Sequence, residues 1–190
     1  MKEKMKPDCE FILNWSKKIK AINHLGGECR SCGILDVRII EFHHENDDKE
    51  FTVSELKSYK WSKYLKEVEK CILLCRRCHA VHHGTGEIKD DRWRKTKEIL
   101  LNYIGTNKCA ECSWSGHQSG LDFHHVNSDE KEFSLSRIPR LYSTVDITKE
   151  IVNELIKCKV LCCNCHQIKH ITNRFDILTD KIYDKVDKLK

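Results

Sequence analysis

Apolar residues recur at helical spacing in two stretches of the chain, residues 11–25 and residues 93–104, and a glycine follows each stretch. In the first stretch these apolar positions are Ile12, Trp15, Ile19 and Ile22. A spacing of three or four residues predicts an amphipathic helix, and a following glycine favours its end. Both stretches are therefore expected to be helices.

Other patterns predict strands, short helices and loops. Residues 34–42 are rich in β-branched residues and predict a strand that ends at the adjacent pair His43 and His44. A helix is predicted over residues 62–70. Residues 84–91 combine glycines and charges without periodicity and are expected to form a linker. Residues 172–190 predict a polar helix.

These elements occur twice and in the same order. The segment from Cys71 to His83 recurs from Cys158 to His170, with its cysteines and histidines in the same register. A C-x2-C pair and an F-H-H triplet precede the segment in both cases. Self-similarity of this kind indicates a tandem duplication. The sequence predicts two units, residues 1–90 and residues 91–190, each with a leading helix.

The cysteines predict that each repeated unit contains a metal site. Eight of the 12 cysteines form four C-x2-C pairs, and the sequence shows no signal peptide, so zinc sites are favoured over a secreted disulfide scaffold. A closed four-thiolate site has no open coordination position, which makes its role structural. Two structural zinc ions are expected, bound by Cys29, Cys32, Cys75 and Cys78, and by Cys109, Cys112, Cys162 and Cys165.

Histidine supplies a second, repeated set of candidate ligands. Eight of the 11 histidines fall into two matching groups: His43, His44, His79 and His83, and His124, His125, His166 and His170. Histidines four residues apart lie on one face of a helix, whereas adjacent histidines on a strand point to opposite faces. One histidine of each adjacent pair can therefore bind a metal ion while its neighbour faces a substrate. The pattern predicts a metal-dependent active site.

The combination F-H-H, K-x-F and K-C-x-x-L-C-x-x-C-H-x3-H resembles the HNH nucleases, which have the ββα-metal fold. The resemblance covers each repeat from its first C-x2-C pair to its last histidine. Tandem units with two four-cysteine zinc sites also resemble small ββα-metal restriction endonucleases. The resemblance implies an α+β fold with two tandem ββα-metal (HNH) units, each held by a four-cysteine zinc and preceded by a helix.

The same resemblance implies an activity and roles for the histidines. The chain is expected to hydrolyse phosphodiester bonds in double-stranded DNA, as a restriction, phage or mobile-element endonuclease. His44 and His125 would be the general bases, a task that suits an imidazole. One catalytic divalent ion, expected to be Mg²⁺ or Mn²⁺, would be bound in each unit by His43, His79 and His83, or by His124, His166 and His170.

The chain departs from the family pattern at one position. Where the family usually has its middle asparagine, which has an orienting role, the repeats have Lys70 and Lys157, and that role is left unassigned. Asn164 offers a substitute in the second repeat, whereas its counterpart in the first repeat is Arg77. This difference favours the second repeat as the one with the dominant activity.

Charge permits binding to nucleic acid without requiring it. The net charge of +5 is spread evenly along the chain, so a basic patch would have to arise from folding. The basic and aromatic residues expected to contact DNA are Lys57, Lys60, Trp61, Lys63, Arg76 and Arg77 in the first unit, and Arg137, Arg140, Tyr142 and Lys169 in the second.

Two other functions remain open: a non-catalytic zinc module that binds DNA or RNA, and an RNA-directed nuclease. The retention of both histidine groups argues against the first, because binding alone needs only the cysteines. A double-strand break needs two active sites. Either the two repeats face opposite strands within one chain, or one repeat cuts and the protein forms a homodimer on DNA. The second arrangement is favoured, because restriction enzymes with palindromic sites resemble it. No apolar run approaches the length of a membrane span, so a cytoplasmic protein without a membrane partner is expected.

Overall fold

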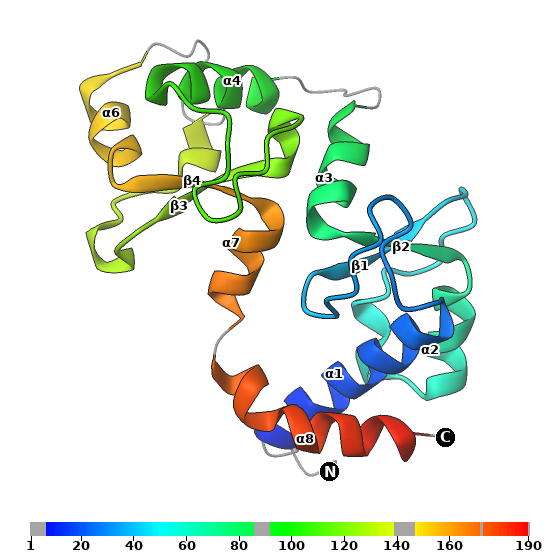
Figure 1. Cartoon of the computed structure of the whole chain (residues 1–190). Helices are drawn as coiled ribbons and strands as arrows, with labels where there is room; N and C mark the ends of the chain where they lie inside the picture. Colours follow the sequence, from blue (N-terminus) through cyan, green and yellow to red (C-terminus); the bar gives the residue numbers. More distant parts are fainter. Residues whose placement is uncertain (1–6, 86–91, 139–146, 172, 190) are drawn as a thin grey trace. The chain divides into compact units, whose positions relative to one another are not determined.

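The computed structural model describes residues 7–85, 92–138, 147–171 and 173–189 (Figure 1). It is an α+β structure, in which helices accompany two small antiparallel sheets. None of the helices in these ranges is both long and apolar enough to cross a membrane.

Each repeat contains a leading helix, a two-stranded hairpin and a helix that directly follows the second strand. The elements of the first repeat are α1 (Pro7–His24), β1 (Ile40–His44), η1 (Glu55–Ser58), α2 (Trp61–Val68), β2 (Cys71–Cys75) and α3 (Arg76–Thr85). Those of the second are α4 (Arg92–Ile104), η2 (Gln118–Gly120), β3 (Leu121–His125), η3 (Ser128–Glu130), η4 (Leu135–Arg137), α6 (Lys149–Leu155), β4 (Cys158–Cys162) and α7 (Cys163–His170), and α8 (Asn173–Asp187) follows.

The two hairpins have the same register. His44 lies opposite Cys71 in the first hairpin, and His125 lies opposite Cys158 in the second. Cys71 is buried in the core, and Cys158 is half-buried and packs against the core; burial raises the pKa of each thiol to about 11. The matched register places the paired histidines and the C-x2-C motifs at equivalent positions in both repeats.

The first strand is shorter than the sequence pattern predicts. Residues 34–42 were expected to be extended, but β1 begins at Ile40. The side chain of Asp36 accepts hydrogen bonds from the backbone N–H and the guanidinium of Arg38, and its backbone carbonyl accepts one from the N–H of Ile39. These local bonds form a turn that competes with strand pairing.

The C-terminal helix is amphipathic rather than polar throughout. Its residues Phe175, Leu178, Ile182 and Val186 are buried and pack against Ile19 of α1. Trp15 and Phe175 meet edge to face with ring centroids 4.5 Å apart. In Figure 1, α1 and α8 lie side by side, so the tail completes a core that the leading helix alone would leave open.

This packing predicts a large difference between two isoleucines of α8. Ile182 is fully buried, whereas Ile177 is 77% exposed. Ile182→Ala is expected to lower the free energy of unfolding by about 2–5 kcal/mol, because it leaves a cavity between α1 and α8. Ile177→Ala is the matched control and should change it by less than about 0.5 kcal/mol. Equal effects in chemical denaturation would contradict the observed docking of α8.

By contacts, the chain divides into two compact units, Met1–Cys75 with His170–Lys190, and Arg76–Lys169. The sequence repeats suggest 1–90 and 91–190. The units differ from the repeats because α8 packs on α1, while α3 packs on η2. Gly84 shows how closely α3 packs: a Cβ added there would lie 1.8 Å from Oγ of Ser119. Gly84 is thus a buried helical residue and not part of a linker.

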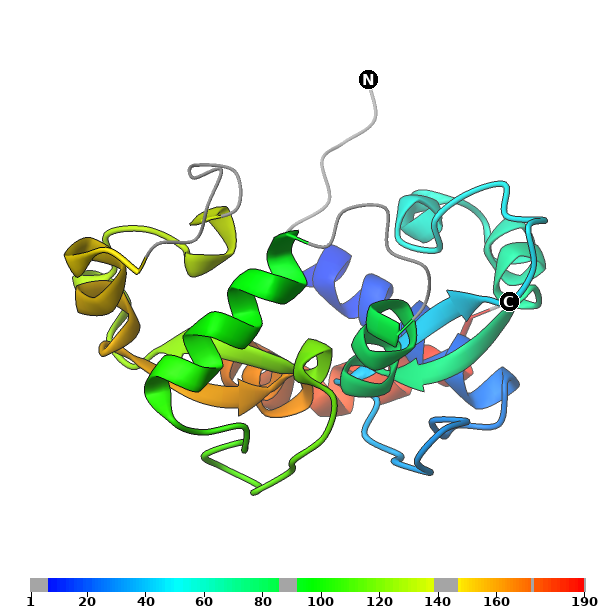
Figure 2. The ribbon, with the colours of Figure 1, turned by 90° about the horizontal axis from the view of Figure 1, so that it is seen from above.

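The helix α4 lies across the hairpin of β3 and β4 in both ribbon views (Figures 1 and 2). Its Leu100 and Leu101 are buried, and the Nζ of Lys97 donates a hydrogen bond of 2.6 Å to the carbonyl oxygen of Leu121. The leading helix therefore fixes the start of the strand that ends at His124 and His125.

Candidate metal centres

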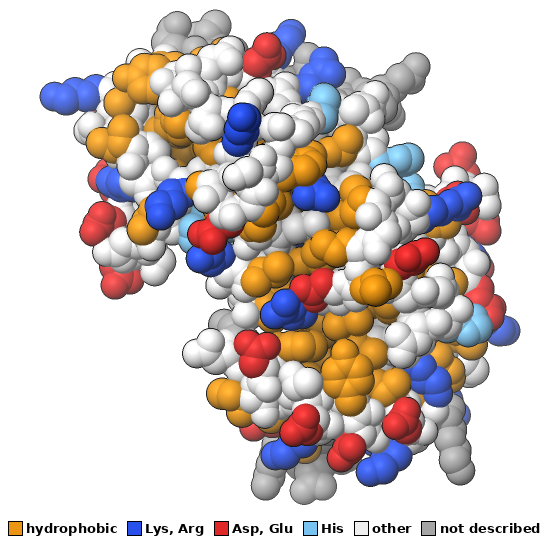
Figure 3. Space-filling view, viewed as in Figure 1, with side chains coloured by type: hydrophobic (Ala, Val, Ile, Leu, Met, Phe, Trp, Pro, Cys, Tyr) orange, Lys and Arg blue, Asp and Glu red, His pale blue; other side chains and the backbone are white. Residues whose placement is uncertain are grey.

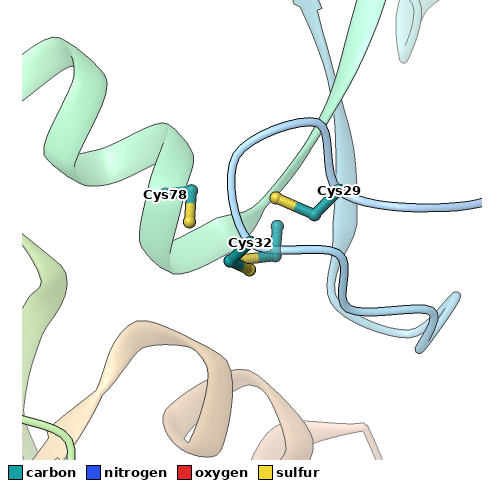
Figure 4. Close-up of side chains that lie close together, drawn as sticks. Cys29, Cys32 and Cys78 are labelled. Atoms are coloured by element: carbon teal, nitrogen blue, oxygen red, sulfur yellow. The ribbon is translucent and has the colours of Figure 1, made fainter.

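Each repeat brings four cysteine sulfurs together. Within each cluster the four Sγ atoms lie within 4.8 Å of one another. In the first cluster, Cys29 and Cys32 come from the loop before β1, Cys75 ends β2, and Cys78 lies in the first turn of α3, with its sulfur facing the loop (Figure 4). The second cluster has the same construction, from Cys109, Cys112, Cys162 and Cys165.

The sulfur geometry fits zinc and does not fit disulfides. The Sγ atoms of Cys32 and Cys75 lie 3.7 Å apart, as do those of Cys112 and Cys162. Tetrahedral zinc with Zn–S bonds of about 2.3 Å requires sulfurs about 3.8 Å apart, whereas a disulfide requires about 2.05 Å. Either group could therefore hold one structural zinc ion, with all four positions taken by protein.

The loop that carries each C-x2-C pair is a tight turn. The N–H of Gly33 donates to the carbonyl of Cys29, and the N–H of Ser113 donates to that of Cys109. Gly33 and Ser113 occupy equivalent positions, and both have positive φ, +70° and 58°. This left-handed residue turns the chain so that both thiols face the same point.

One cysteine of each cluster has surroundings that favour the thiolate, the form that binds metal. Burial raises the pKa of the Cys29 thiol, but backbone hydrogen bonds from Cys75, Cys32 and Ser31 outweigh burial and lower that pKa to about 7. Cys109 behaves in the same way and also has a pKa of about 7. The polypeptide thus stabilises negative charge on one sulfur of each cluster, whereas burial raises the pKa values of Cys162 and Cys165 in the second cluster.

Three histidines of each repeat form a second type of cluster. The groups are His43, His79 and His83, and His124, His166 and His170, and in each group one ring nitrogen per residue lies within 4.8 Å of the others. Nε2 of His79 and Nε2 of His83 are 3.1 Å apart, which suits two ligands of one ion. Because imidazole is a good ligand for zinc, nickel, iron and copper whereas magnesium prefers oxygen, the donors fit a transition-metal ion better than Mg²⁺.

In the second repeat, a carboxylate bonds to one histidine of the three-histidine cluster. Nδ1 of His166 lies 3.0 Å from Oδ2 of Asp122, and Lys97 places its Nζ 3.9 Å from the other oxygen of that carboxylate. Burial raises the pKa of Asp122, but the hydrogen bond to His166 and the charge of Lys97 outweigh burial and lower it. The equivalent lysine of the first repeat, Lys17, instead donates to the carbonyl oxygens of Lys57 and Tyr59.

The histidine next to each cluster is bonded to a buried glutamate. Nε2 of His44 lies 2.8 Å from Oε1 of Glu67, and Nε2 of His125 lies 2.7 Å from Oε1 of Glu154. The side chains of these glutamates are only 3% and 1% exposed. Adjacent side chains of a strand point to opposite faces, and the adjacent histidines of each repeat have different partners. One belongs to the three-histidine cluster, and the other is bonded to a buried carboxylate.

Each glutamate is also bonded to a lysine three residues later. Nζ of Lys70 lies 3.1 Å from Oε2 of Glu67, and Nζ of Lys157 lies 2.9 Å from Oε2 of Glu154. These are the lysines that stand where the HNH pattern has its asparagine. The two glutamates are not among the residues predicted from the sequence, although the motif E-x2-K-C, which ends at the first residue of β2 and of β4, marks them in both repeats.

Asn164, the candidate substitute for the missing asparagine, is buried and bonds to the start of α3. It is 4% exposed, and its Oδ1 accepts a hydrogen bond of 2.9 Å from the backbone N–H of Arg77. The amide therefore caps the N-terminal turn of α3. Arg77 in turn places its guanidinium over the ring of Trp114, 4.8 Å from the centroid.

Several residues expected to contact DNA have partners within the protein. Lys63 lies over the rings of Phe51 and Tyr59, and Trp61 stacks on Tyr64. Lys169 pairs with Glu111 at 3.1 Å. Lys57, Lys60 and Arg137 are exposed, Arg76 is half-buried, and Arg140 and Tyr142 lie outside the described residues.

Basic and acidic side chains are interspersed on the face shown in Figure 3. This agrees with a net charge of +5 that comes from 34 basic and 29 acidic residues. The distribution of charge on this face therefore does not test the predicted contacts with DNA.

No known protein family, curated protein or solved structure matches this chain. The candidate function consequently rests on the two kinds of cluster and on their neighbours.

Proposed function

We propose that the chain is a metal-dependent endonuclease of the HNH type that hydrolyses phosphodiester bonds in double-stranded DNA. The observation that carries the proposal is the repeated pairing of a three-histidine cluster with an adjacent histidine bonded to a buried glutamate. A structural zinc module needs only the cysteines, whereas this second arrangement combines a cation site and a candidate base. Such a pair of groups is what metal-assisted hydrolysis requires.

The four-cysteine clusters have a supporting role in this proposal. Cys78 and Cys165 lie one residue before His79 and His166, so a zinc ion at each cluster would fix the first turn of the helix that presents the histidines. A well-placed ligand set must be held rigidly to keep its geometry. Structural zinc thus supports the candidate active site without taking part in the reaction.

The histidines have distinct roles in the proposed reaction. A cation bound by His124, His166 and His170 would polarise the phosphate and stabilise the leaving 3′ oxygen. His125 would accept a proton from the attacking water through Nδ1, because its Nε2–H is donated to Glu154. The products would carry 5′-phosphate and 3′-hydroxyl ends. The first repeat would use His44 in the same way. With the second repeat as the dominant one, a homodimer would bring two dominant sites to one DNA duplex.

The contact between His166 and Asp122 predicts a change in metal affinity. In protein that keeps its structural zinc, Asp122→Asn is expected to weaken Ni²⁺ binding at the second histidine cluster by about 10-fold, because a ligating imidazole loses its carboxylate partner. Isothermal titration calorimetry measures the change. Asp129→Asn, an exposed acidic residue beyond the same strand, is the control and should bind as the wild type does. An unchanged affinity in Asp122→Asn would contradict a ligand-positioning role for this carboxylate.

Parallel incubation with supercoiled plasmid and with structured RNA tests the proposed substrate. We expect cleavage of the plasmid in the presence of a divalent transition metal. Cleavage of RNA alone would replace the DNA assignment with an RNA-directed nuclease. No cleavage of either substrate with any metal would overturn the proposed activity.

A further inference from the structure

A buried network links the candidate base of each repeat to a lysine. In the second repeat, Oε1 of Glu154 lies 2.7 Å from Nε2 of His125 and accepts backbone N–H bonds from Glu132 at 3.0 Å and Phe133 at 3.3 Å. Its other oxygen accepts the bond from Lys157. Every oxygen of this buried carboxylate therefore has a donor.

The first repeat contains the same network, built from residues at equivalent positions. Oε1 of Glu67 lies 2.8 Å from Nε2 of His44 and accepts backbone N–H bonds from Glu50 at 3.1 Å and Phe51 at 3.2 Å. Lys70 occupies the place of Lys157 and also bonds to Oε1 of Glu50 at 2.7 Å. Because the same His–Glu–Lys network occurs in both repeats, it is a feature of the repeated fold and not of one repeat alone.

The surroundings keep both carboxylates ionised. Burial raises the pKa of Glu67, but hydrogen bonds from Phe51, Lys70, His44 and Glu50 outweigh it and lower the pKa to about 2. Burial likewise raises the pKa of Glu154, and hydrogen bonds from Lys157 and His125 are the largest of the effects that lower it. An ionised carboxylate only accepts hydrogen bonds, so the facing nitrogen of the histidine must carry the proton.

This requirement fixes the histidine ring in one tautomer. With the proton on Nε2, the lone pair of a neutral imidazole is on Nδ1. The glutamate also fixes the ring orientation, because its own position is set by two backbone N–H groups and by the lysine. The lysine in turn offsets the cost of burying a carboxylate.

We propose that Glu154 with Lys157, and Glu67 with Lys70, are the positioning residues of His125 and His44, and that each Glu–Lys pair does the orienting work which the HNH pattern assigns to its asparagine. The proposal rests on the proposed nuclease function. It accounts for the lysines at the asparagine positions: each lysine acts on the base through a glutamate and does not itself touch the substrate.

The test uses two readouts on the full chain with its structural zinc, of which only one depends on activity. Long-range ¹H–¹⁵N correlation spectra report which ring nitrogen of a histidine carries the proton, with the His125 signals assigned from the spectrum of His125→Ala. The wild type should show His125 protonated on Nε2. In Glu154→Gln the amide N–H groups compete with Lys157 and with Nε2–H as donors, so a shift toward the Nδ1–H tautomer is expected.

The kinetic readout separates positioning from folding. Glu154→Gln is expected to lower kcat for plasmid cleavage by at least about 10-fold with KM nearly unchanged, since a histidine held in the wrong tautomer can cost as much as about 10⁴-fold. Lys157→Met is the milder second variant and should lower kcat in the same direction, while Lys157→Arg should restore most of it. Glu150→Gln, on an exposed turn of the same helix α6, is the matched control and should leave both constants unchanged.

The outcomes separate the two proposals. A wild type that cleaves, with Glu154→Gln and Lys157→Met folded and equally active, overturns the positioning role and leaves the nuclease function intact. Finding His125 protonated on Nδ1 in the wild type also overturns it. A wild type that cleaves nothing while His125 changes tautomer in Glu154→Gln overturns the nuclease function and confirms the Glu–His contact.

Discussion

Replacing Cys75 with serine is expected to unfold the first repeat and to lower the zinc content by about one ion per chain. Cys75 is fully buried, and its sulfur lies 3.7 Å from that of Cys32 in the cluster. Zinc binding to such sites supplies about 10–16 kcal/mol, comparable to the whole stability of a small domain. Elemental analysis and circular dichroism on the reduced protein measure both effects.

The matched control is Cys71→Ala. Cys71 begins the same strand and is also buried, but it belongs to the hydrophobic core and to neither cluster. This variant should keep its zinc content and lose about 1 kcal/mol of unfolding free energy, as a small core truncation does. If Cys75→Ser retains as much zinc as Cys71→Ala, the four-cysteine assignment is incorrect.

Replacing His125 with alanine is expected to lower plasmid cleavage by about 10²–10⁴-fold, the usual effect of losing a well-placed general base. His44→Ala is its counterpart and should have a much smaller effect. The expected difference does not come from Asn164, whose amide is bonded to Arg77. It comes from the two equivalent lysines: Lys97 lies 3.9 Å from the carboxylate of Asp122, which bonds to His166, whereas Lys17 donates to the carbonyl oxygens of Lys57 and Tyr59.

The assay follows supercoiled, nicked and linear plasmid under one metal condition. Both variants keep every residue of the three-histidine clusters, so their metal affinities serve as the control for folding. If His44→Ala and His125→Ala reduce cleavage equally, or if each nicks one strand at nearly the normal rate, both repeats are active and the predicted dominance of the second is wrong.

The parts of the fold that depend on local spacing could be predicted from the sequence. Ligands two or three residues apart in a tight turn, such as Cys29 and Cys32, need little tertiary information to be recognised. The duplication of the motifs supported the prediction of two similar units, and the pairing of β1 with β2 is indeed repeated by the pairing of β3 with β4. The coarse description, an α+β chain with two four-cysteine clusters, is confirmed.

The parts that depend on distant contacts could not be predicted in the same way. Glu154 meets His125 across 29 positions, and Asn164 meets the N–H of Arg77 across 87. Residues this far apart in the sequence come together only in the folded chain, so their contacts cannot be read from local spacing. The docking of α8 on α1 was missed for a different reason: Phe175, Leu178 and Ile182 do recur at helical spacing, but charged residues between them lower the mean hydropathy of the segment.

Plasmid cleavage by the wild type, with its structural zinc retained, tests the proposed nuclease function most directly. Protein freed of loosely bound metal is incubated with supercoiled plasmid, first without and then with added Mn²⁺, Ni²⁺ or Mg²⁺, and the ends of the products are labelled. We predict no cleavage without added metal, and nicked or linear DNA with 5′-phosphate ends when a transition-metal ion is added. Plasmid that stays intact under every metal, in protein with both zinc ions bound, would contradict the proposed function.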